Sequence, residues 1–440
     1  MIGVSGIRGV FGDGLTEEIA ERFAYAYGRV YNGTIVVGRD SRISGKVISD
    51  AVKSGLRKAA CDVIDLGLAT TPTTEMAVTH KKAAGGVIIT ASHNPREWNG
   101  LKFLGPEGIF LTVSQGQEVV NVFETVGDIG SCALTGTMTE WDGADKLHID
   151  AILDLDIIDD GLIQSKGYTV VLDAVNGVGG AICAGLLECL GCKVHGINLE
   201  PTGEFAHGAE PIPENVADLC AQVKQTGADI GFAIDPDTDR LALVTEEGIA
   251  PGEEYTLALA ADYIMGRTGG VAACNLSTSR MIDDAVLRHG TAVHRSPVGE
   301  INVVKLMQEV DAVIGGEGNG GVILPALHHG RDAVVGIALM LQIMAERSKS
   351  LSELVGTFTR YTMLKDKIDI EGMGDWKGPV LDEFDGADMD MRDGIKVNLP
   401  DSWVHVRASN TEPIIRVMAE ASSEDAARKL IDRVNGALGK

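Results

Sequence analysis

The chain has 440 residues, of which 45% are hydrophobic, and its formal net charge is -25 at pH 7. This length allows about two to four domains, and the hydrophobic share excludes wholesale disorder. The negative charge argues against nucleic acid or an anionic membrane as the main partner, because both require a basic footprint.

Three short apolar segments, each followed by a polar loop and a helix-like stretch, predict the core strands of three domains. They lie at 34–37, 168–172 and 270–274. Strands that are apolar on both faces are typical of parallel sheets covered by helices. We therefore expect three similar α/β domains with parallel or mixed sheets, at residues 1–142, 143–248 and 249–362.

The last part of the chain has a different pattern. Apolar runs at 394–397, 403–407 and 414–420 predict strands, and a helix is expected from about residue 423 to 438. Ser422 or Ser423 can cap that helix, and acidic residues in the first turn favour its N-terminus. The sequence thus predicts a smaller α+β domain at residues 363–440.

We infer the cellular compartment from the N-terminus, the longest apolar run and the cysteines. The chain begins Met-Ile-Gly-Val, without the basic segment and apolar block of a signal peptide. The longest apolar stretch, 333–345, is shorter than the roughly 18–20 residues of a membrane span, which predicts a buried helix. Cys189 and Cys192 have C-x-x-C spacing, but they lie at an expected helix end, whereas a redox pair is expected at a helix N-terminus. We expect reduced thiols in a cytoplasmic protein, with no membrane partner.

The hexapeptide Thr90-Ala91-Ser92-His93-Asn94-Pro95 directly follows the apolar run 86–89. A buried strand that stops abruptly presents one serine hydroxyl, that of Ser92, in a turn. Such a hydroxyl can carry a phosphoryl group. Earlier in the chain, the segment 5–9 places Arg8 in a glycine-flanked loop.

The segment Asp235-Pro236-Asp237-Thr238-Asp239-Arg240 has a carboxylate at every other position. On an extended loop these carboxylates can point to one side, and a hard cation such as Mg²⁺ would relieve their repulsion. An acidic turn without metal is one alternative. A calcium loop is another, with Glu246 at its twelfth position, but Arg240 occupies the place that requires glycine.

Two later loops carry groups suited to a phosphorylated sugar. In the glycine-rich segment 314–322, Glu317 and Asn319 can hydrogen-bond to sugar hydroxyls, although an ordinary flexible turn remains an alternative. The loop 407–413 and the residue Arg416 predict a phosphate receptor, because arginine binds phosphate through paired hydrogen bonds. Surface ion pairs are the alternative interpretation of these arginines.

Five motifs in this order resemble those of the α-D-phosphohexomutase family, which includes phosphoglucomutases, phosphomannomutases and phosphoglucosamine mutases. They are S-G-I-R-G, T-A-S-H-N-P, D-P-D-T-D-R, G-E-G-N-G-G and R-A-S-N-T-E-P, and they extend over nearly the whole chain. The resemblance implies an isomerase with four domains around a central cleft, the first three α/β and the last smaller.

The family mechanism that the resemblance implies is a phosphoryl exchange. Phosphorylated Ser92 would donate its phosphoryl group to a hexose monophosphate, form a hexose 1,6-bisphosphate that also acts as activator, and take back the other phosphate. The residues implied by the motifs are Arg8, His93 and Lys102 for catalysis; Ser92, Asp235, Asp237 and Asp239 for Mg²⁺; and Arg240, Glu317, Asn319, Arg407, Ser409, Asn410, Thr411 and Arg416 for substrate.

Two departures from the family pattern leave the proton-transfer groups open. Many bacterial members have histidine where this chain has Gly321, and also after the Val-Gly pair that Glu300 follows here. The candidates are therefore Lys102, Glu300, His328 and His329.

The form of the sugar loop resembles archaeal mutases and favours glucosamine phosphate slightly over mannose or glucose phosphate. The alternatives to a mutase are a phosphatase or kinase and an inactive phosphosugar-binding protein.

For the oligomeric state, we expect a monomer or homodimer.

Overall fold

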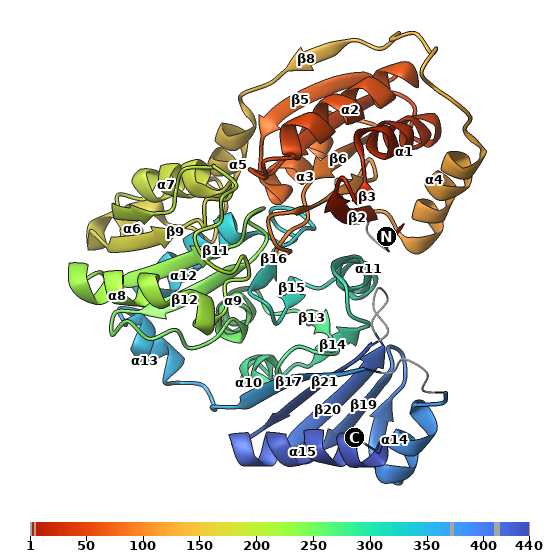
Figure 1. Cartoon of the computed structure of the whole chain (residues 1–440). Helices are drawn as coiled ribbons and strands as arrows, with labels where there is room; N and C mark the ends of the chain where they lie inside the picture. The colour runs from red at the N-terminus through yellow and green to blue at the C-terminus, as the bar shows by residue number, and fades with distance from the viewer. Residues whose placement is uncertain (1, 4–5, 370–373, 409–413, 440) are drawn as a thin grey trace. The chain divides into compact units, whose positions relative to one another are not determined.

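The computed structural model describes residues 2–3, 6–369, 374–408 and 414–439. These residues form two compact units, each described here by itself. Unit 1 comprises residues 1–260 and 319–355, and unit 2 comprises residues 261–318 and 356–440. Figure 1 shows the course of the chain through both units.

The first sheet of unit 1 has eight strands in the order β1-β2-β7-β6-β4-β5-β8, with β3 paired to β2. Strands β4, β5 and β6 are parallel, whereas β2 and β7 are antiparallel, so the sheet is mixed. The strands are β1 Ile2–Gly3, β2 Gly6–Phe11, β3 Gly14–Leu15, β4 Thr34–Arg39, β5 Asp62–Leu68, β6 Gly85–Ile89, β7 Trp98–Leu104 and β8 Met138–Glu140.

Helices cover both faces of this sheet (Figure 1). Alternate residues of β4 face opposite sides of the sheet. Ile35 and Val37 join the core under α1 and α2, whereas Gly38 faces α3, since an added Cβ there would meet Thr74. This alternation explains why the strand is apolar on both sides. The helices are α1 Glu17–Val30, α2 Gly45–Lys58, α3 Thr71–His80 and α4 Val113–Thr125.

The second sheet of unit 1 has the order β10-β9-β11-β12. The first three strands are parallel, and β12 returns antiparallel to β11. The elements are α5 Ala144–Leu153, α6 Asp160–Lys166, β9 Thr169–Asp173, α7 Gly180–Cys189, β10 Lys193–Ile197, a 3₁₀ turn at Pro213–Asn215, α8 Ala217–Thr226, β11 Ile230–Ile234 and β12 Leu241–Thr245.

Unit 1 also contains β16 (Gly321–Ile323), α12 (Ala333–Arg347) and α13 (Leu351–Val355). Every residue of α12 from Ala333 to Ala345 is buried, which confirms the helix predicted from the apolar run. The Asp332 side chain caps α12, because it accepts hydrogen bonds from the backbone N–H groups of Val334 and Val335. Helix α9 (Glu254–Thr268) crosses from unit 1 to unit 2 in the sequence.

Unit 2 begins with a parallel arrangement in which β13 lies between β14 and β15. An antiparallel sheet follows, in the order β17-β21-β20-β19-β18. The elements are β13 Ala272–Asn275, α10 Met281–Leu287, β14 Val293–Ser296, α11 Glu300–Val310, β15 Ile314–Glu317, β17 Thr362–Asp369, α14 Lys377–Glu383, β18 Asp388–Asp390, β19 Ile395–Leu399, β20 Ser402–Ala408, β21 Ile414–Ala421 and α15 Glu424–Ala437.

The C-terminal α+β pattern predicted from the sequence is confirmed. Helix α15 packs its buried residues against the apolar face of the antiparallel sheet, and Ser423 accepts the capping hydrogen bond from Ala426 N. Among the two cap candidates, Ser423 is the one the structure uses.

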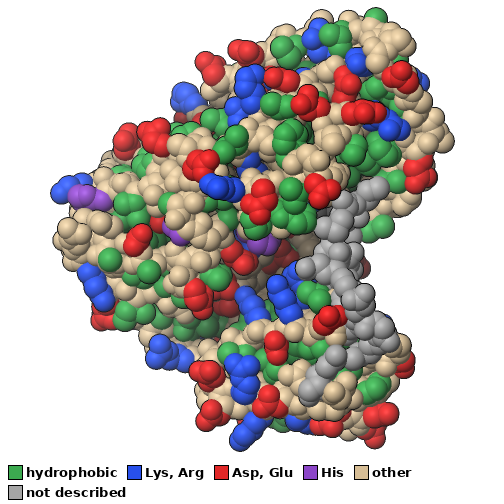
Figure 2. Space-filling view, viewed as in Figure 1, with side chains coloured by type: hydrophobic (Ala, Val, Ile, Leu, Met, Phe, Trp, Pro, Cys, Tyr) green, Lys and Arg blue, Asp and Glu red, His purple; other side chains and the backbone are tan. Residues whose placement is uncertain are grey.

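Three further expectations concern charge, thiols and membranes. Acidic side chains are scattered over the face of the molecule seen in Figure 2, in keeping with the net charge. All seven cysteines are free, and Cys189 is the last residue of α7, at the helix end predicted for it. Within the described parts of the chain, no helix is both long and apolar enough to span a membrane.

Candidate active site

Ser92 lies in the turn that follows the fully buried strand β6. Its backbone φ is +50°, a left-handed value that residues other than glycine adopt rarely. The Ser92 N–H donates to Thr90 Oγ1 at 2.9 Å, and Thr90 Oγ1 donates to Asp40 Oδ2 at 2.6 Å. Only 2% of Ser92 is exposed. These contacts hold the backbone of the turn that carries Ser92, and the buried strand followed by a turn agrees with the prediction from the hexapeptide.

Arg42 fixes the same turn from a distant part of the sequence. Its side chain is fully buried and forms an ion pair with Asp40 at 3.0 Å. Its two terminal nitrogens donate to four backbone carbonyl oxygens, those of Ser92 (2.5 Å), Asn94 (2.7 Å), Pro95 (2.6 Å) and Trp98 (3.0 Å). Sequence reasoning missed this residue; the only signal was its place after β4, in the polar loop 40–44.

Replacing Arg42 with lysine is expected to destabilise unit 1 by about 2–3 kcal/mol, because a single ammonium leaves several buried carbonyls unpaired. We also expect kcat to fall more than KM changes, since the displaced turn carries Ser92. Denaturant unfolding and steady-state kinetics measure both effects. Arg57→Lys is the matched control, because Arg57 Nε donates to one carbonyl, that of Gly136, at 2.9 Å. Equal losses in the two variants would contradict the special role of Arg42.

The three aspartates lie in the loop between β11 and β12, and all three are fully buried. Asp235 Oδ1 shapes the loop by accepting from the backbone N–H groups of Asp239 (3.0 Å) and Arg240 (3.1 Å). One carboxylate oxygen from each aspartate lies within 4.8 Å of the others. Because β12 begins at Leu241, the loop has no room for the twelve residues of a calcium loop.

This carboxylate cluster fits a small hard cation. Asp237 Oδ1 and Asp239 Oδ1 are buried and have no hydrogen-bond partner among the described residues. Burial and the charges of Asp239 and Asp237 raise the pKa of Asp235 well above its usual range. Such a cluster is unfavourable without a compensating positive charge, and oxygen-only ligands suit Mg²⁺. Ser92 Oγ lies 3.4 Å from Asp235 Oδ2, so the hydroxyl borders the same cluster.

Several cationic side chains surround the aspartates. Lys102 Nζ lies 2.7 Å from Asp237 Oδ2 and 3.5 Å from Asp239 Oδ2. Arg240 binds Glu210 at 2.6 Å and lies 3.7 Å from Asp239, while Arg8 donates to Asn94 Oδ1 at 3.1 Å. These cations offset part of the negative charge of the aspartates.

The neighbouring charges and burial shift the pKa values of Lys102 and His93. Although burial opposes it, the charge of Asp237 raises the pKa of Lys102, so Lys102 is a cation near neutral pH. The charge of Arg240, together with burial and Arg8, lowers the pKa of His93 well below its usual value. His93 is therefore neutral, and its Nδ1 lies 3.3 Å from Ser92 Oγ.

The sugar-loop residues fall in different units. Asn319 belongs to unit 1, where its Oδ1 accepts from Gly321 N at 3.2 Å. Glu317 belongs to unit 2, where its carboxylate accepts from Asn275 Nδ2 at 2.7 Å and from Gly299 N at 3.2 Å. Asn319 is thus held within its own loop, whereas Glu317 is held by two other segments of unit 2.

The arginines predicted to bind phosphate lie on adjacent strands of unit 2. Arg407 in β20 is the register partner of Arg416 in β21. Arg407 Nε lies 3.4 Å from Asp393 Oδ2. Ser409, Asn410 and Thr411 lie outside the described residues.

The other candidates for proton transfer are His328, His329 and Glu300, and the structure shows their surroundings. His328 Nε2 lies 3.2 Å from Asp332 Oδ2, which His148 Nε2 also contacts at 2.8 Å. These contacts place His328 at the cap of α12. Burial lowers the pKa of His329. Glu300 is the first residue of α11 in unit 2 and is buried.

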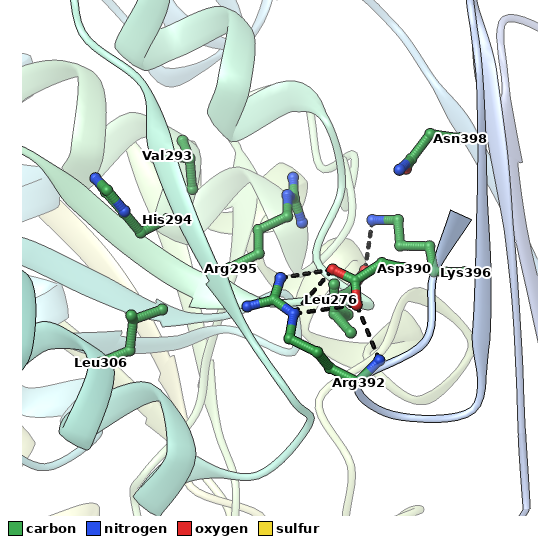
Figure 3. Close-up of a pocket in the computed structure, with 9 residues that line it drawn as sticks. All are labelled: Leu276, Val293, His294, Arg295, Leu306, Asp390, Arg392, Lys396 and Asn398. Atoms are coloured by element: carbon green, nitrogen blue, oxygen red, sulfur yellow. Dashed lines mark hydrogen bonds and ion pairs between the residues drawn. The ribbon is translucent and has the colours of Figure 1, made fainter. Parts of the chain in front are cut away.

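A separate cavity of about 320 Å³ lies within unit 2 (Figure 3). None of the residues predicted from the motifs lines it. Its cations already have partners: Arg392 binds Asp390 through three hydrogen bonds, and Lys396 Nζ donates to Leu276 O at 2.6 Å. Burial, together with the charge of Arg295, lowers the pKa of Lys396 to about 7.

This buried lysine predicts a pH dependence of stability. Above its folded pKa of about 7, Lys396 is neutral in the folded state, while in the unfolded chain it keeps its proton to a pH of about 10.4. The unfolded state then binds more protons, so stability rises with pH by up to about 1.4 kcal/mol per pH unit. Lys396→Met should remove this rise in denaturant unfolding between neutral pH and about pH 9. Equal slopes for the two proteins would show that Lys396 does not titrate there.

Comparison with known proteins agrees with this picture. The family models described as phosphoglucomutase/phosphomannomutase, α/β/α domain I, domain II and domain III, match residues 1–128, 146–248 and 252–361. The model of the C-terminal domain of the same family matches residues 372–437. Three α/β/α domains followed by a different C-terminal domain confirm the predicted fold class.

Individual relatives are similar over almost their full lengths. A phosphoglucomutase/phosphomannomutase of Thermococcus kodakarensis is 38% identical, covering 98% of this chain and 97% of that protein. A protein of Methanopyrus kandleri named "probable phosphoglucosamine mutase" is 37% identical, covering 98% and 96%. The crystal structure of a family protein from Burkholderia thailandensis, 27% identical, superposes with a TM-score of 0.86 over 100% of this chain and 98% of that one. The chain belongs to the phosphoglucomutase/phosphomannomutase family, the α-D-phosphohexomutases, whose members are isomerases.

Proposed function

We propose that this phosphohexomutase interconverts hexose 1-phosphates and hexose 6-phosphates through a phosphorylated Ser92. The observation that carries the proposal is the position of the Ser92 hydroxyl, 3.4 Å from Asp235 in a carboxylate cluster that Lys102 also contacts, at 2.7 Å from Asp237. A nucleophile that must accept and return a phosphoryl group needs positive charge on the oxygens in transfer.

The residues that would hold Mg²⁺ are Asp235, Asp237, Asp239 and the phosphorylated Ser92. When bound, the ion would neutralise charge on the transferring phosphoryl group. The buried oxygens of Asp237 and Asp239 that lack hydrogen bonds support this assignment. Lys102 and Arg8 would stabilise the charge of the same phosphoryl group, and Arg240 would support them.

The remaining roles follow the motifs. Glu317 and Asn319 would bind sugar hydroxyls, and the loop of Arg407 and Arg416 would hold the phosphate that does not react. The pairing of these two arginines on neighbouring strands supports a single phosphate receptor. Ser409, Asn410 and Thr411 are proposed for the same loop. The bisphosphate intermediate would also serve as activator by phosphorylating Ser92.

Proton transfer to and from the sugar hydroxyl would involve a group beside Ser92. Lys102 contacts the carboxylates and His93 lies beside the Ser92 hydroxyl, whereas His328 contacts Asp332, which caps α12. Neutral His93 can hydrogen-bond to the Ser92 hydroxyl, 3.3 Å away, but the neighbouring cations make it a weak base, while charged Lys102 is suited to stabilise the phosphoryl group. We propose His93 and Lys102 in these two roles.

We propose four domains, at residues 1–142, 143–248, 249–362 and 363–440, in a cytoplasmic enzyme that is a monomer or homodimer. For the sugar, we propose glucosamine phosphate. The similarity to the Methanopyrus kandleri protein supports this choice, and the similarity to the Thermococcus kodakarensis protein supports mannose and glucose phosphates as the alternatives.

The test compares kcat/KM for the 1-phosphates of glucosamine, mannose and glucose, each with a catalytic amount of the matching 1,6-bisphosphate. The proposal expects all activity to require the bisphosphate and the highest kcat/KM with glucosamine 1-phosphate. A preference for another hexose would overturn the sugar assignment alone. Net release of phosphate would indicate a phosphatase, and binding without turnover would indicate an inactive phosphosugar-binding protein.

A further inference from the structure

The space that a side chain at residue 321 would fill is occupied by the side chain of Arg331. A Cβ added at Gly321 would lie 2.3 Å from Arg331 Cδ and 3.0 Å from Arg331 Cγ. The backbone itself does not require glycine, since Gly321 is not among the residues with positive φ. The middle of the Arg331 side chain therefore fills the position of any side chain at residue 321.

The arginine reaches the carboxylate cluster through this space. Arg331 Nη2 donates to Asp239 Oδ2 at 2.6 Å, and the Arg331 side chain is 8% exposed. Lys102 Nζ lies 3.5 Å from the same Asp239 oxygen. Arg331 is thus a second cation at the oxygen of a carboxylate that we assign to Mg²⁺.

The backbone of Arg331 is held in place on both sides. Arg331 forms an isolated β-bridge with Ile323, and the next residue, Asp332, donates its N–H to Val322 O at 2.8 Å. The Asp332 side chain caps α12 and binds His148 at 2.8 Å. With its backbone anchored and its Nη2 bound to Asp239, the guanidinium loses little rotational freedom when it binds an anion, which favours electrostatic catalysis.

We propose that Arg331 is an active-site residue that contacts the transferring phosphoryl group beside Asp239, and that Gly321 and Arg331 form a functional pair. This inference rests on the proposed function, because it assigns Arg331 to the same phosphoryl-transfer site. Arg331 weakens the attraction of the aspartates for a divalent cation and strengthens the attraction of the site for phosphate oxygens. It keeps its charge throughout the reaction and takes no proton.

Arg331→Gln is the first test. We expect kcat to fall by about 10²–10³, with a smaller change in KM, because the guanidinium acts on the phosphoryl group in transfer. We also expect tighter Mg²⁺ binding to the unphosphorylated protein in calorimetric titration, since a positive charge beside Asp239 is lost. Arg331→Lys should keep Mg²⁺ binding near that of the parent protein. Arg29→Gln, at an exposed arginine of α1, is the control and should change neither value.

A double-mutant cycle tests the pair. In Gly321→Ala, the new Cβ would displace Arg331, so kcat should fall about as far as in Arg331→Ala. In the Arg331→Ala background, Gly321→Ala should cost much less, because the contact of the new Cβ with Asn319 Oδ1, at 3.1 Å, is then the tight one that remains. Thermal unfolding of each variant checks that the fold persists. Equal costs of Gly321→Ala in both backgrounds would overturn the pairing.

Two results would overturn the role of Arg331: a kcat of Arg331→Gln near that of the parent protein, or unchanged Mg²⁺ binding in that variant. Failure of the proposed function would look different. In that case the parent protein would show no bisphosphate-dependent mutase activity, whereas the Mg²⁺ titration of Arg331→Gln would still report whether Arg331 acts on the metal site.

Discussion

Removing the Ser92 hydroxyl is expected to abolish hexose phosphate interconversion, with a loss of kcat on the order of 10⁶, as for other covalent nucleophiles. The hydroxyl is the atom that would carry the phosphoryl group, and it is the serine oxygen that borders the carboxylate cluster at 3.4 Å. Ser92→Ala and Ser92→Gly should both be inactive in a coupled mutase assay. The glycine variant matters because glycine accepts the φ of +50° at this position without strain.

The fold should survive these changes. Ser54→Ala is a suitable control, since Ser54 Oγ donates to Glu21 in α1, away from the site, and this variant should keep its activity. Substantial turnover by both Ser92 variants would show that another group accepts the phosphoryl group.

Asp237→Asn is expected to reduce kcat by about 10²–10³ and to weaken Mg²⁺ binding. The change keeps the shape of the side chain but removes one of the three buried carboxylates. It also breaks the ion pair of 2.7 Å with Lys102. Loss of one partner of a buried pair costs about 3–5 kcal/mol, but Asp239 remains 3.5 Å from Lys102 and should lessen the loss.

Calorimetric Mg²⁺ titration, kinetics and thermal unfolding measure the three effects of Asp237→Asn. Asp65→Asn is the matched control, because Asp65 also accepts from a lysine, Lys53, at 2.7 Å, but lies outside the carboxylate cluster. It should lose some stability and leave the Mg²⁺ affinity unchanged. Normal Mg²⁺ affinity in Asp237→Asn would remove this residue from the metal site.

The local geometry of the candidate site could be predicted where it depends on consecutive residues. Ser92 follows a recognisable strand and turn, and the three aspartates alternate within one loop, so their local geometry is contained in the local sequence. The same holds for α12, whose apolar run marked most of its length, and for α15, whose N-terminus was marked by a cap candidate.

The supporting residues could not be predicted, because their partners are distant in sequence. Arg42 lies 50 residues before Ser92 and reaches it only after the strands of the first sheet have paired. Arg331 reaches Asp239 across 92 positions. A single arginine in a polar loop has no periodicity or motif, so the sequence does not distinguish it from a solvated side chain. Gly321 was noted as a missing histidine, but the arginine that fills its space emerges only from the fold.

The most direct test of the account follows the phosphoryl group itself. The protein is incubated with hexose 1,6-bisphosphate labelled with radioactive phosphate, separated from it, and then mixed with unlabelled hexose 6-phosphate. We predict that the label first appears on Ser92, identified by peptide mapping, and then leaves with the sugar as bisphosphate. Label that never reaches Ser92, or that stays there when the sugar is added although the protein turns over, would contradict the central role of this hydroxyl.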